Sequence, residues 1–289
     1  MSIEAIKKAS TYGEVLNRAS FFLEKNQKSP HIAQWLLKEQ FSMSLTDILI
    51  KQRQHMPEEH KTLFIKDVLE ASTGKPAQYI VGHEWFYDRQ FKVTPHTLIP
   101  RPETEEWFDR YIKQLPSKSL RVLDIGTGSG VLAISHKLER KQDEVTAVDI
   151  NEDTLAVARQ NAENLGADVT FQKSDMIKNV KGRFDLIVSN PPYIGKDEWR
   201  EMDESVLAYE PKEALFAEEE GLFFYKELAC TLSDYLNKSG TIILEIGYKQ
   251  GLAVKKLFEE AFPSARIDIW KDYNEHDRAV CIKSSGKED

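Results

Sequence analysis

The tetrapeptide Asn190-Pro191-Pro192-Tyr193, which follows the apolar run 184–189, constrains this chain more than any other feature. The run is too short for a helix and rich in branched residues, so it predicts a buried parallel strand. Prolines lack an N–H donor, so they end the strand and leave their carbonyl groups free to accept hydrogen bonds. This leaves two hydrogen-bond acceptors beside the Tyr193 ring: the Asn190 side-chain oxygen and the Pro191 carbonyl. Two acceptors and an aromatic ring suit a planar –NH2 group, so the tetrapeptide indicates an enzyme that methylates an amide or exocyclic amino nitrogen. The tetrapeptide alone is also compatible with a turn that only ends a strand.

Size and charge favour two domains and argue against one class of partner. The chain has 289 residues, 41% of them hydrophobic, so it exceeds an average domain and can form a packed core. Residues 1–85 carry 11 Lys and Arg against 10 Asp and Glu, whereas the remainder carries 28 against 37. Non-specific binding of nucleic acid needs Lys and Arg to neutralise phosphates, so the acidic second part argues against a nucleic-acid partner.

The sequence gives no sign of a membrane segment, a metal site or a disulfide framework. No apolar run approaches the ~18 residues that a membrane-spanning helix needs. The start, Met1-Ser2-Ile3-Glu4, has an early acid and no apolar core, so it is not a signal peptide and we expect a cytoplasmic protein. Cys230 and Cys281 form no motif, and the seven histidines are scattered without metal-ligand spacing.

Residues 1–80 predict an N-terminal helical domain. Ser29-Pro30 precedes an apolar segment as a cap and a first-turn proline, and Pro57 opens another helix with two acids in its first turn. Gly74 and then Pro76 end that helix. The region holds no catalytic motif, so it is either a module that recognises a partner or a stabilising extension.

Residues 81–105 predict a hairpin and a proline-rich linker. The aromatic segment 85–87 and the segment 91–93 flank a short polar turn, which is typical of a β-hairpin. Pro95, Pro100 and Pro102 follow, and they make the segment stiff. It is either a simple linker or a rigid wall of the active site.

Residues 106–289 alternate between strand and helix patterns, which predicts a doubly wound parallel sheet. We expect helices starting near 131 and covering 152–165, 221–236 and 249–261. The expected strands are seven: 121–125, 144–149, one opening at 169–171, 184–189, 241–246, 266–270 and 279–283.

Glycines at 126, 128 and 130 follow the first of these strands, where they allow a tight turn and a close approach of a ligand to a helix start. Asp149 ends the second strand, the position of an acceptor for ribose hydroxyl groups, although it is also compatible with a surface or capping acid. A nicotinamide enzyme would share both features, but it would need neither Asp124 before the glycines nor the Asn-Pro-Pro-Tyr tetrapeptide. The combination better fits S-adenosylmethionine, with Asp175 and Met176 flanking the adenine.

Four stretches, at 99–105, 124–130, 148–150 and 189–194, together resemble the HemK/PrmC family. The likeness continues through 209–211, 244–247 and 277–278, so it covers essentially the whole chain. The pairing of the proline-arginine-proline stretch with Asn-Pro-Pro-Tyr is specific, whereas Asn-Pro-Pro-Tyr alone is shared with adenine-N6 methyltransferases of nucleic acid.

The resemblance implies a Rossmann-like methyltransferase domain that uses S-adenosylmethionine to methylate the side-chain nitrogen of the glutamine in the Gly-Gly-Gln motif of class 1 peptide chain release factors. It also implies that the helical domain helps to bind the release factor. With the residue patterns above, it predicts three sets of site residues and no metal. The sets are catalytic Asn190, Pro191 and Tyr193; cofactor-binding Asp124, Gly126, Thr127, Gly128, Ser129, Gly130, Asp149, Asp175, Met176 and Asn190; and substrate-binding Asn190, Pro191, Pro192, Tyr193, Arg101 and Glu103.

Two departures from the family pattern concern turns. Residues 218–221 (Glu-Glu-Glu-Gly) lie where the family tends to have a more glycine-rich turn, and Asn274-Glu275-His276 lacks a glycine that is often found there. Both put the local turn geometry in question, and neither touches the chemistry.

Three alternative functions stay open at this point. An adenine-N6 methyltransferase would share Asn-Pro-Pro-Tyr, but the acidic catalytic half argues against it. A glutamine methyltransferase of a ribosomal protein is a closer variant. A non-catalytic module that senses the cofactor is the third, and the intact tetrapeptide argues against it.

Overall fold

The computed structural model describes residues 2–285, which form two compact units. The helical unit runs to His83 and also contains residues 203–209. The sheet unit contains residues 84–202 and the chain from Glu210 onward. No helix in this described part of the chain combines the length and the apolar character needed to cross a membrane.

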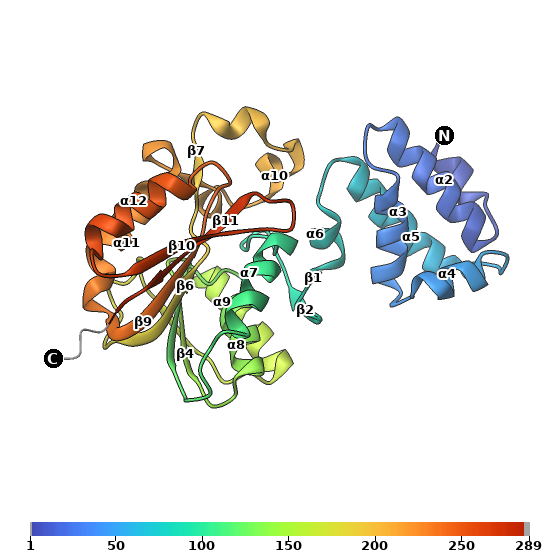
Figure 1. Cartoon of the computed structure of the whole chain (residues 1–289). Coiled ribbons are helices and arrows are strands. Elements are labelled where there is room, and N and C mark those ends of the chain that lie inside the picture. Colours follow the sequence, from blue (N-terminus) through green and yellow to red (C-terminus); the bar gives the residue numbers. More distant parts are fainter. Residues whose placement is uncertain (1, 286–289) are drawn as a thin grey trace. The chain divides into compact units, whose positions relative to one another are not determined.

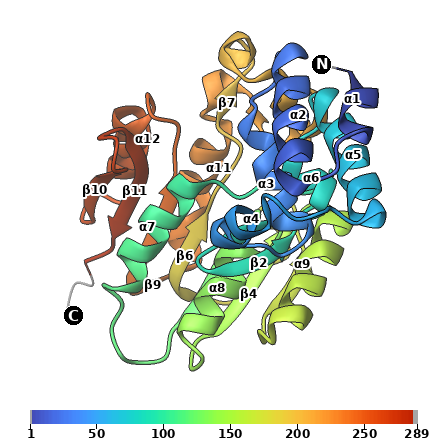
Figure 2. The same ribbon diagram turned by 90° about the vertical axis from the view of Figure 1, so that its right-hand side faces the viewer.

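The helical unit packs amphipathic helices around one apolar core (Figures 1 and 2). Two of its helices begin with a capping box, in which Thr11 or Ser44 and an acid three residues later satisfy each other's free N–H groups. Helices α2, α3 and α5 contact one another, and Leu36, Phe64 and Val68 are fully buried between them. The helices are α1 (Ile3–Lys7), α2 (Tyr12–Lys25), α3 (His31–Gln40), α4 (Leu45–Lys51), α5 (Glu58–Ser72), α6 (Ala77–Val81) and α10 (Glu204–Tyr209).

The sheet unit contains a seven-stranded sheet in the order β10-β11-β9-β6-β3-β4-β5. Strand β11 runs antiparallel to both of its neighbours, and the other neighbouring pairs are parallel. The predicted fold class, a Rossmann-like doubly wound sheet, is therefore confirmed. The strands are β3 (Arg121–Ile125), β4 (Glu144–Asp149), β5 (Thr170–Lys173), β6 (Phe184–Ser189), β9 (Leu236–Glu245), β10 (Arg266–Lys271) and β11 (Asp277–Lys283).

Helices cover both faces of this sheet (Figure 1). Consecutive strand residues point to opposite faces, so Ile187 and Ile242 pack in the core beneath α11 and α12, whereas Leu186 and Ile243 pack in the core beneath α7 and α8. Both faces are apolar because both are covered. The helices are α7 (Pro102–Ile112), α8 (Val131–Glu139) and α9 (Glu152–Leu165) on one side, and α11 (Phe223–Thr231) and α12 (Gly251–Ala261) on the other.

The connection order places a switch point between β3 and β6. The chain proceeds from β3 outward through β4 to β5, and then returns to β6 on the other side of β3. The Ser189 hydroxyl at the end of β6 donates to the Ile125 carbonyl at the end of β3 (2.7 Å) and joins the two strand ends. Ligands of such sheets bind at the carboxyl ends of the strands beside the switch point, which is where the predicted glycine loop and Asn190 follow.

The predicted hairpin is present as β1 (His83–Phe86) and β2 (Arg89–Lys92), but its turn lies at 87–88 and not at the polar residues 88–90 between the predicted strands. Tyr87 and Asp88 at its turn have φ of 48° and 59°, the left-handed values that a two-residue turn needs to match the twist of its strands. Residues 102–105, which we assigned to the linker, instead form the first turn of α7, because the fixed φ of Pro102 suits the first position of a helix.

The prediction of one helix over 221–236 was wrong at its C-terminal end. Helix α11 ends at Thr231, a 3₁₀ turn covers Leu232–Asp234, and β9 already begins at Leu236. Leu232 and Leu236 are both buried and lie four positions apart, the spacing of one helix face. The apolar pattern therefore gives no sign that a turn separates them. The two-residue strands β7 (Ile194–Gly195) and β8 (Phe216–Ala217) were not predicted, because such short segments carry no periodic pattern.

The two turns that depart from the family pattern, at 218–221 and 274–276, contain glutamates with a left-handed backbone conformation. Glu219 and Glu220 have φ of 54° and 56°, and Glu275 has φ of 64°. Non-glycine residues pay a steric cost in this region. The turns therefore keep a glycine-like shape in this chain despite the glutamate side chains.

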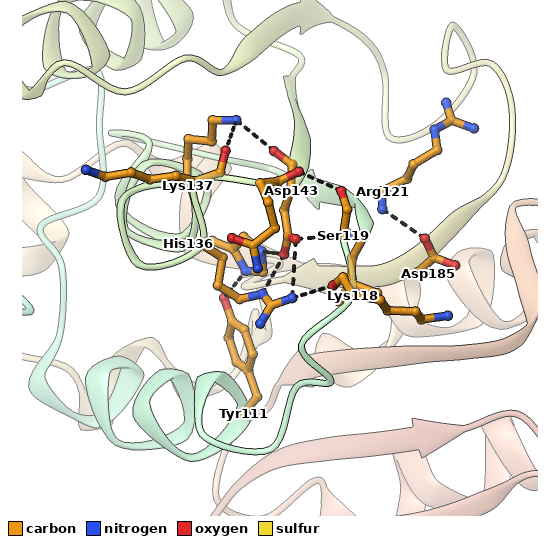
Figure 3. Close-up of polar contacts among 12 residues, drawn as sticks. Tyr111, Lys118, Ser119, Arg121, His136, Lys137, Asp143 and Asp185 are labelled. Carbon is orange, nitrogen blue, oxygen red and sulfur yellow. Dashed lines mark hydrogen bonds and ion pairs between the residues drawn. The ribbon is translucent and has the colours of Figure 1, made fainter.

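A buried polar cluster lies at the amino edge of the sheet (Figure 3). His136 is fully buried; its Nδ1 lies 3.2 Å from the Tyr111 hydroxyl and its Nε2 lies 2.8 Å from Asp143 Oδ2. Asp143 also accepts from the Leu120 N–H (3.0 Å) and from Arg140 Nε (2.7 Å). Leu120 and Asp143 directly precede β3 and β4, so the cluster joins the starts of two parallel strands, at the edge opposite the predicted site.

Candidate active site

The loop from Gly126 to Gly130 joins β3 to α8. The N–H groups of Gly126 and Thr127 both donate to the Val148 carbonyl (2.9 and 3.0 Å), which folds the loop against the end of β4. Gly126 and Gly128 have φ of 70° and 58°, and a Cβ on either would project into open space. Their backbone therefore faces outward, free to approach a ligand. A Cβ on Gly130 would instead lie 2.7 Å from the Ile134 side chain, so this residue serves the packing of α8.

Asp149, at the end of β4, is bonded to the same loop. Its Oδ2 accepts from the Gly128 N–H (3.0 Å), and its Oδ1 accepts from the Asn151 N–H (3.0 Å). Burial raises the pKa of Asp149, while these N–H groups oppose the rise by favouring the carboxylate. A carboxylate has about four lone-pair sites, so Asp149 keeps acceptor capacity for hydroxyl groups of a ligand.

Asp124 lies under the glycine loop and is fully buried. Its Oδ2 accepts from the Thr127 hydroxyl (2.6 Å), and within the described part of the chain its buried Oδ1 has no hydrogen-bond partner. Burial raises the pKa of Asp124 to about 7, while the Thr127 hydroxyl and, less strongly, the Ala133 N–H favour the carboxylate and oppose the rise. A buried oxygen without a hydrogen-bond partner destabilises the folded protein. A donor from a bound group would supply the missing hydrogen bond.

The end of β5 brings a third segment to the site. The Ser174 N–H donates to the Asp149 carbonyl (2.9 Å), so Asp175 and Met176 follow β5 beside the end of β4. Met176 adopts φ of 50° and packs partly against the core, and Asp175 forms an ion pair with Lys178. Ile150 is 58% exposed next to Asp149. Sequence reasoning passed over Ile150, although an apolar residue directly after a strand-ending acid was a usable signal.

Asn190 directly follows β6, and Gly126 directly follows β3. Because Ser189 pairs with Ile125 in the sheet, the tetrapeptide and the glycine loop leave the sheet side by side. Within residues 2–285, neither the Asn190 side chain nor the Pro191 carbonyl makes a hydrogen bond. The two acceptors inferred from the prolines therefore have no partner among the described residues, and their contact with a substrate stays a prediction.

Tyr193 lies at the other end of the tetrapeptide and packs against the core. Burial and the nearby Glu245 carboxylate raise the pKa of the Tyr193 hydroxyl, whereas Arg278 and Arg101 oppose the rise. Tyr193 is accordingly neutral at physiological pH. It acts as an apolar ring with a polar tip and not as a base.

The first turn of α7 is attached to the end of β9. Glu245 Oε2 accepts from the Thr104 hydroxyl (2.6 Å) and from Trp107 Nε1 (2.9 Å), and Glu245 is 1% exposed. Burial raises the pKa of Glu245, against these two hydrogen bonds. Strand β9 neighbours β6, so the proline-rich stretch is held beside the tetrapeptide. Sequence reasoning did not include Glu245 in the site, although an acid that ends an apolar strand is an unusual feature.

The two predicted substrate-binding residues in this stretch have different surroundings. Arg101 donates to Glu210 Oε1 (2.6 Å), and the other oxygen of the buried Glu210 accepts from the Ile99 N–H (3.2 Å). Glu103 is half-buried in the first turn of α7. Arg101 thus stiffens the segment before α7, and contact of either residue with substrate stays a prediction.

The predicted site residues of the sheet unit thus gather at one edge, where the ends of β3, β4, β5, β6 and β9 meet. Their individual roles stay predictions. No group of three or more His, Cys, Asp or Glu among the described residues could hold a metal ion. The edge offers outward-facing loop backbone, a buried acid with a free oxygen, and two unpaired acceptors.

The sequence of this chain matches those of known proteins. The family model "PrmC N-terminal domain" matches residues 14–82, and the model "Methyltransferase small domain" matches residues 110–215. A release factor glutamine methyltransferase of Enterococcus faecalis is 42% identical over 93% of this chain and 98% of its own length. The chain belongs to the release factor glutamine methyltransferase family. The enzyme of that name from Bacillus subtilis is 37% identical over 94% of this chain and 97% of its own length.

The fold also has a more distant match. A methyltransferase from Pyrococcus furiosus superposes with a TM-score of 0.53 at 19% identity, covering 79% of this chain and all of that one. This likeness concerns the fold alone. The family resemblance that the sequence motifs indicated is confirmed by the close relatives.

Proposed function

We propose that this protein transfers a methyl group from S-adenosylmethionine to the side-chain nitrogen of the glutamine in the Gly-Gly-Gln motif of peptide chain release factors. The observation that carries the proposal is the pair of unpaired acceptors, the Asn190 side chain and the Pro191 carbonyl, beside the outward-facing glycine loop. The family relationship supports the same activity. Substrates of this kind act in translation and would place the enzyme in the cytoplasm.

The residues at the edge of the sheet fit the proposed cofactor. The loop backbone at Gly126 and Gly128 can approach the methionine part, and the free oxygen of Asp124 suits an ammonium donor. Asp149 can accept from ribose hydroxyl groups. Ile150 and Met176 would then bound the adenine. When bound, S-adenosylmethionine supplies a methyl group on a positively charged sulfur.

The substrate amide needs help from the protein because its nitrogen lone pair is delocalised into the carbonyl group. Asn190 and Pro191 would accept its two N–H groups and so aim the lone pair out of the amide plane. The same acceptors favour the positive charge that develops on the nitrogen. Correct orientation of two reactants can lower a barrier by roughly 7–11 kcal/mol, so positioning can supply much of the rate.

The Tyr193 ring would pack on the amide and exclude water, consistent with its neutral hydroxyl group. In the overall reaction a nitrogen–carbon bond forms and the sulfur–methyl bond breaks with its electron pair left on the sulfur. The methylated nitrogen is strongly acidic, and one of its protons passes to solvent. The products are N5-methylglutamine and S-adenosylhomocysteine. No step requires a strong base in the tetrapeptide.

The helical unit is proposed to bind the body of the release factor. A glutamine side chain is common on protein surfaces, and the small site around Asn190 cannot select one protein by itself. Specific protein interfaces usually bury ~1,200–2,000 Å², which requires further contact area. The helical unit holds none of the predicted catalytic residues, so its surface can supply that contact area.

Incubation of the protein with methyl-labelled S-adenosylmethionine and equal amounts of release factor, ribosomal protein or DNA tests the function. Label should enter the release factor alone, and mass spectrometry should place it on the glutamine of the Gly-Gly-Gln peptide. A release factor in which that glutamine is replaced by alanine is the control and should stay unlabelled. Label in DNA or ribosomal protein, with none in release factor, would overturn the proposal.

A further inference from the structure

Gln250 joins the two loops that leave β6 and β9. It directly precedes α12 and is 9% exposed. Its Nε2 donates to the Tyr193 carbonyl (2.8 Å), and its Oε1 accepts from the Gly247 N–H (3.0 Å). One buried side-chain amide thus uses its donor on the tetrapeptide and its acceptor on the loop after the neighbouring strand.

A third segment encloses the same carbonyl. A Cβ built on Gly221 would lie 2.1 Å from the Tyr193 oxygen and 2.6 Å from Gln250 Nε2, so only glycine fits there. A Cβ on Gly247 would lie 3.4 Å from the Tyr193 ring. The peptide group after Tyr193 therefore has little room to rotate. Gln250 binds its carbonyl, and its N–H, which belongs to Ile194, donates to the Leu215 carbonyl (3.0 Å).

The prolines increase the effect of the hydrogen bond from Gln250. In Asn190-Pro191-Pro192-Tyr193 the φ angles of both prolines are locked by their rings. The end at Ser189 is held by β6, and the other end is held at the peptide group after Tyr193, so the ψ rotations between them are restricted from both sides. Fixing that group limits the ψ rotation that sets the direction of the Pro191 carbonyl.

We propose that Gln250 is a positioning residue for methyl transfer: it orients the Asn-Pro-Pro-Tyr loop through the Tyr193 carbonyl. The inference rests on the proposed function, since it assigns a role at the same site. Gln250 needs no contact with substrate or cofactor for this role. Its loss should therefore lower kcat and leave cofactor affinity unchanged.

Two variants separate the donor of Gln250 from its bulk. Gln250→Met keeps the length but removes both hydrogen bonds, and Gln250→Glu keeps an acceptor for Gly247 but cannot donate when ionised. Gln142→Met, at an exposed glutamine, is the matched control. A misplacement of about 1 Å can cost ~100-fold in rate, so we expect kcat of both variants to fall about 10- to 100-fold. The KM for release factor and the calorimetric Kd for S-adenosylmethionine should stay within about threefold.

A pH profile distinguishes positioning from mere stability. A protonated carboxyl group can donate, so the activity of Gln250→Glu relative to wild type should rise as pH falls, while the ratio for Gln250→Met stays flat. Rates are expressed per cofactor-binding site, which removes any unfolded fraction. Should both variants fail to fold, Gln250→Asn, whose amide is one methylene shorter and no longer reaches the Tyr193 carbonyl, tests the same kcat loss.

The possible results separate the two proposals. Wild type that labels release factor, together with Gln250 variants of unchanged kcat per site, overturns the role of Gln250 alone. Variants that lose cofactor affinity in proportion to kcat also overturn it, because Gln250 would then act on the cofactor loop. Wild type that leaves release factor unlabelled overturns the proposed function, and the variants are then compared on whichever acceptor takes label.

Discussion

The Gly128 N–H donates to Asp149 Oδ2 at 3.0 Å, although the two residues are 21 positions apart. The bond joins the loop after β3 to the end of β4, so the proposed ribose acceptor also shapes the glycine loop. Loss of Asp149 would then act twice on cofactor binding: through the lost acceptor and through a loosened loop.

Asp149→Ala should weaken S-adenosylmethionine binding at least ~10-fold. Hydrogen bonds to charged groups contribute about 1.5–3 kcal/mol, and 1.4 kcal/mol corresponds to a factor of ten. Isothermal titration calorimetry measures the affinity, with Asp168→Ala at an exposed acid as the control. Unchanged affinity in Asp149→Ala would rule out the ribose role.

Asn190→Ala should remove one acceptor for the substrate amide and reduce turnover by about 100-fold or more, because the amide would lose its orientation. The fold should survive, since the Asn190 side chain makes no hydrogen bond within the described residues. Steady-state kinetics with release factor measure the effect, and thermal unfolding checks the fold. Asn164→Ala, at an exposed asparagine of α9, should behave as wild type. Normal turnover in Asn190→Ala would contradict the mechanism.

A fragment that starts near Gly82 should still bind cofactor, because the glycine loop, Asp149 and Asn190 all belong to the sheet unit. It should lose most methylation of intact release factor, chiefly through a raised KM. Circular dichroism and cofactor calorimetry must first establish that the fragment is folded, because residues 203–209 belong to the helical unit and lose their packing. A folded fragment with unchanged kcat/KM would reduce the helices to a stabilising extension.

His136 should make stability depend on pH near neutrality. Burial lowers the pKa of His136, so between this lowered value and the usual ~6.5 the unfolded chain binds more protons than the native protein. This contribution is complete above pH ~6.5 and is lost as pH falls. Urea unfolding at pH 7.5 and 5.5 should show a smaller difference in His136→Gln than in wild type. Other titrating groups are common to both proteins, so an equal difference would exclude His136 as the cause.

Glu275→Gly should stabilise the protein by about 0.5–1 kcal/mol. Glu275 has φ of 64°, where a side chain costs roughly 1–2 kcal/mol, whereas glycine has no such penalty and loses part of the gain as extra chain entropy. Glu275→Ala is the control, because it removes the contact with Lys271 at 3.6 Å and keeps the strained backbone. Urea unfolding that ranks glycine at or below alanine would show that the turn is not strained.

Features encoded in neighbouring residues could be read from the sequence. The strand that ends at Asn190, the glycine loop and the position of Asp149 follow from local rules: prolines stop a strand, glycines permit left-handed turns, and the ends of parallel strands share one edge. Helix α9 was predicted over its observed range for the same reason, since its acids and Gly166 mark its two ends.

Other features depended on residues that are distant in the sequence, and only the tertiary structure decided them. Glu245 meets Thr104 across 141 positions, and Gln250 meets Tyr193 across 57. No local pattern announces such partners, because a buried polar group is satisfied by whichever segment the fold brings next to it. The early end of α11 has the same origin: Leu232 packs in the core against the sheet, and Leu236 is already the first residue of β9, so tertiary packing overrides the helical spacing of the chain.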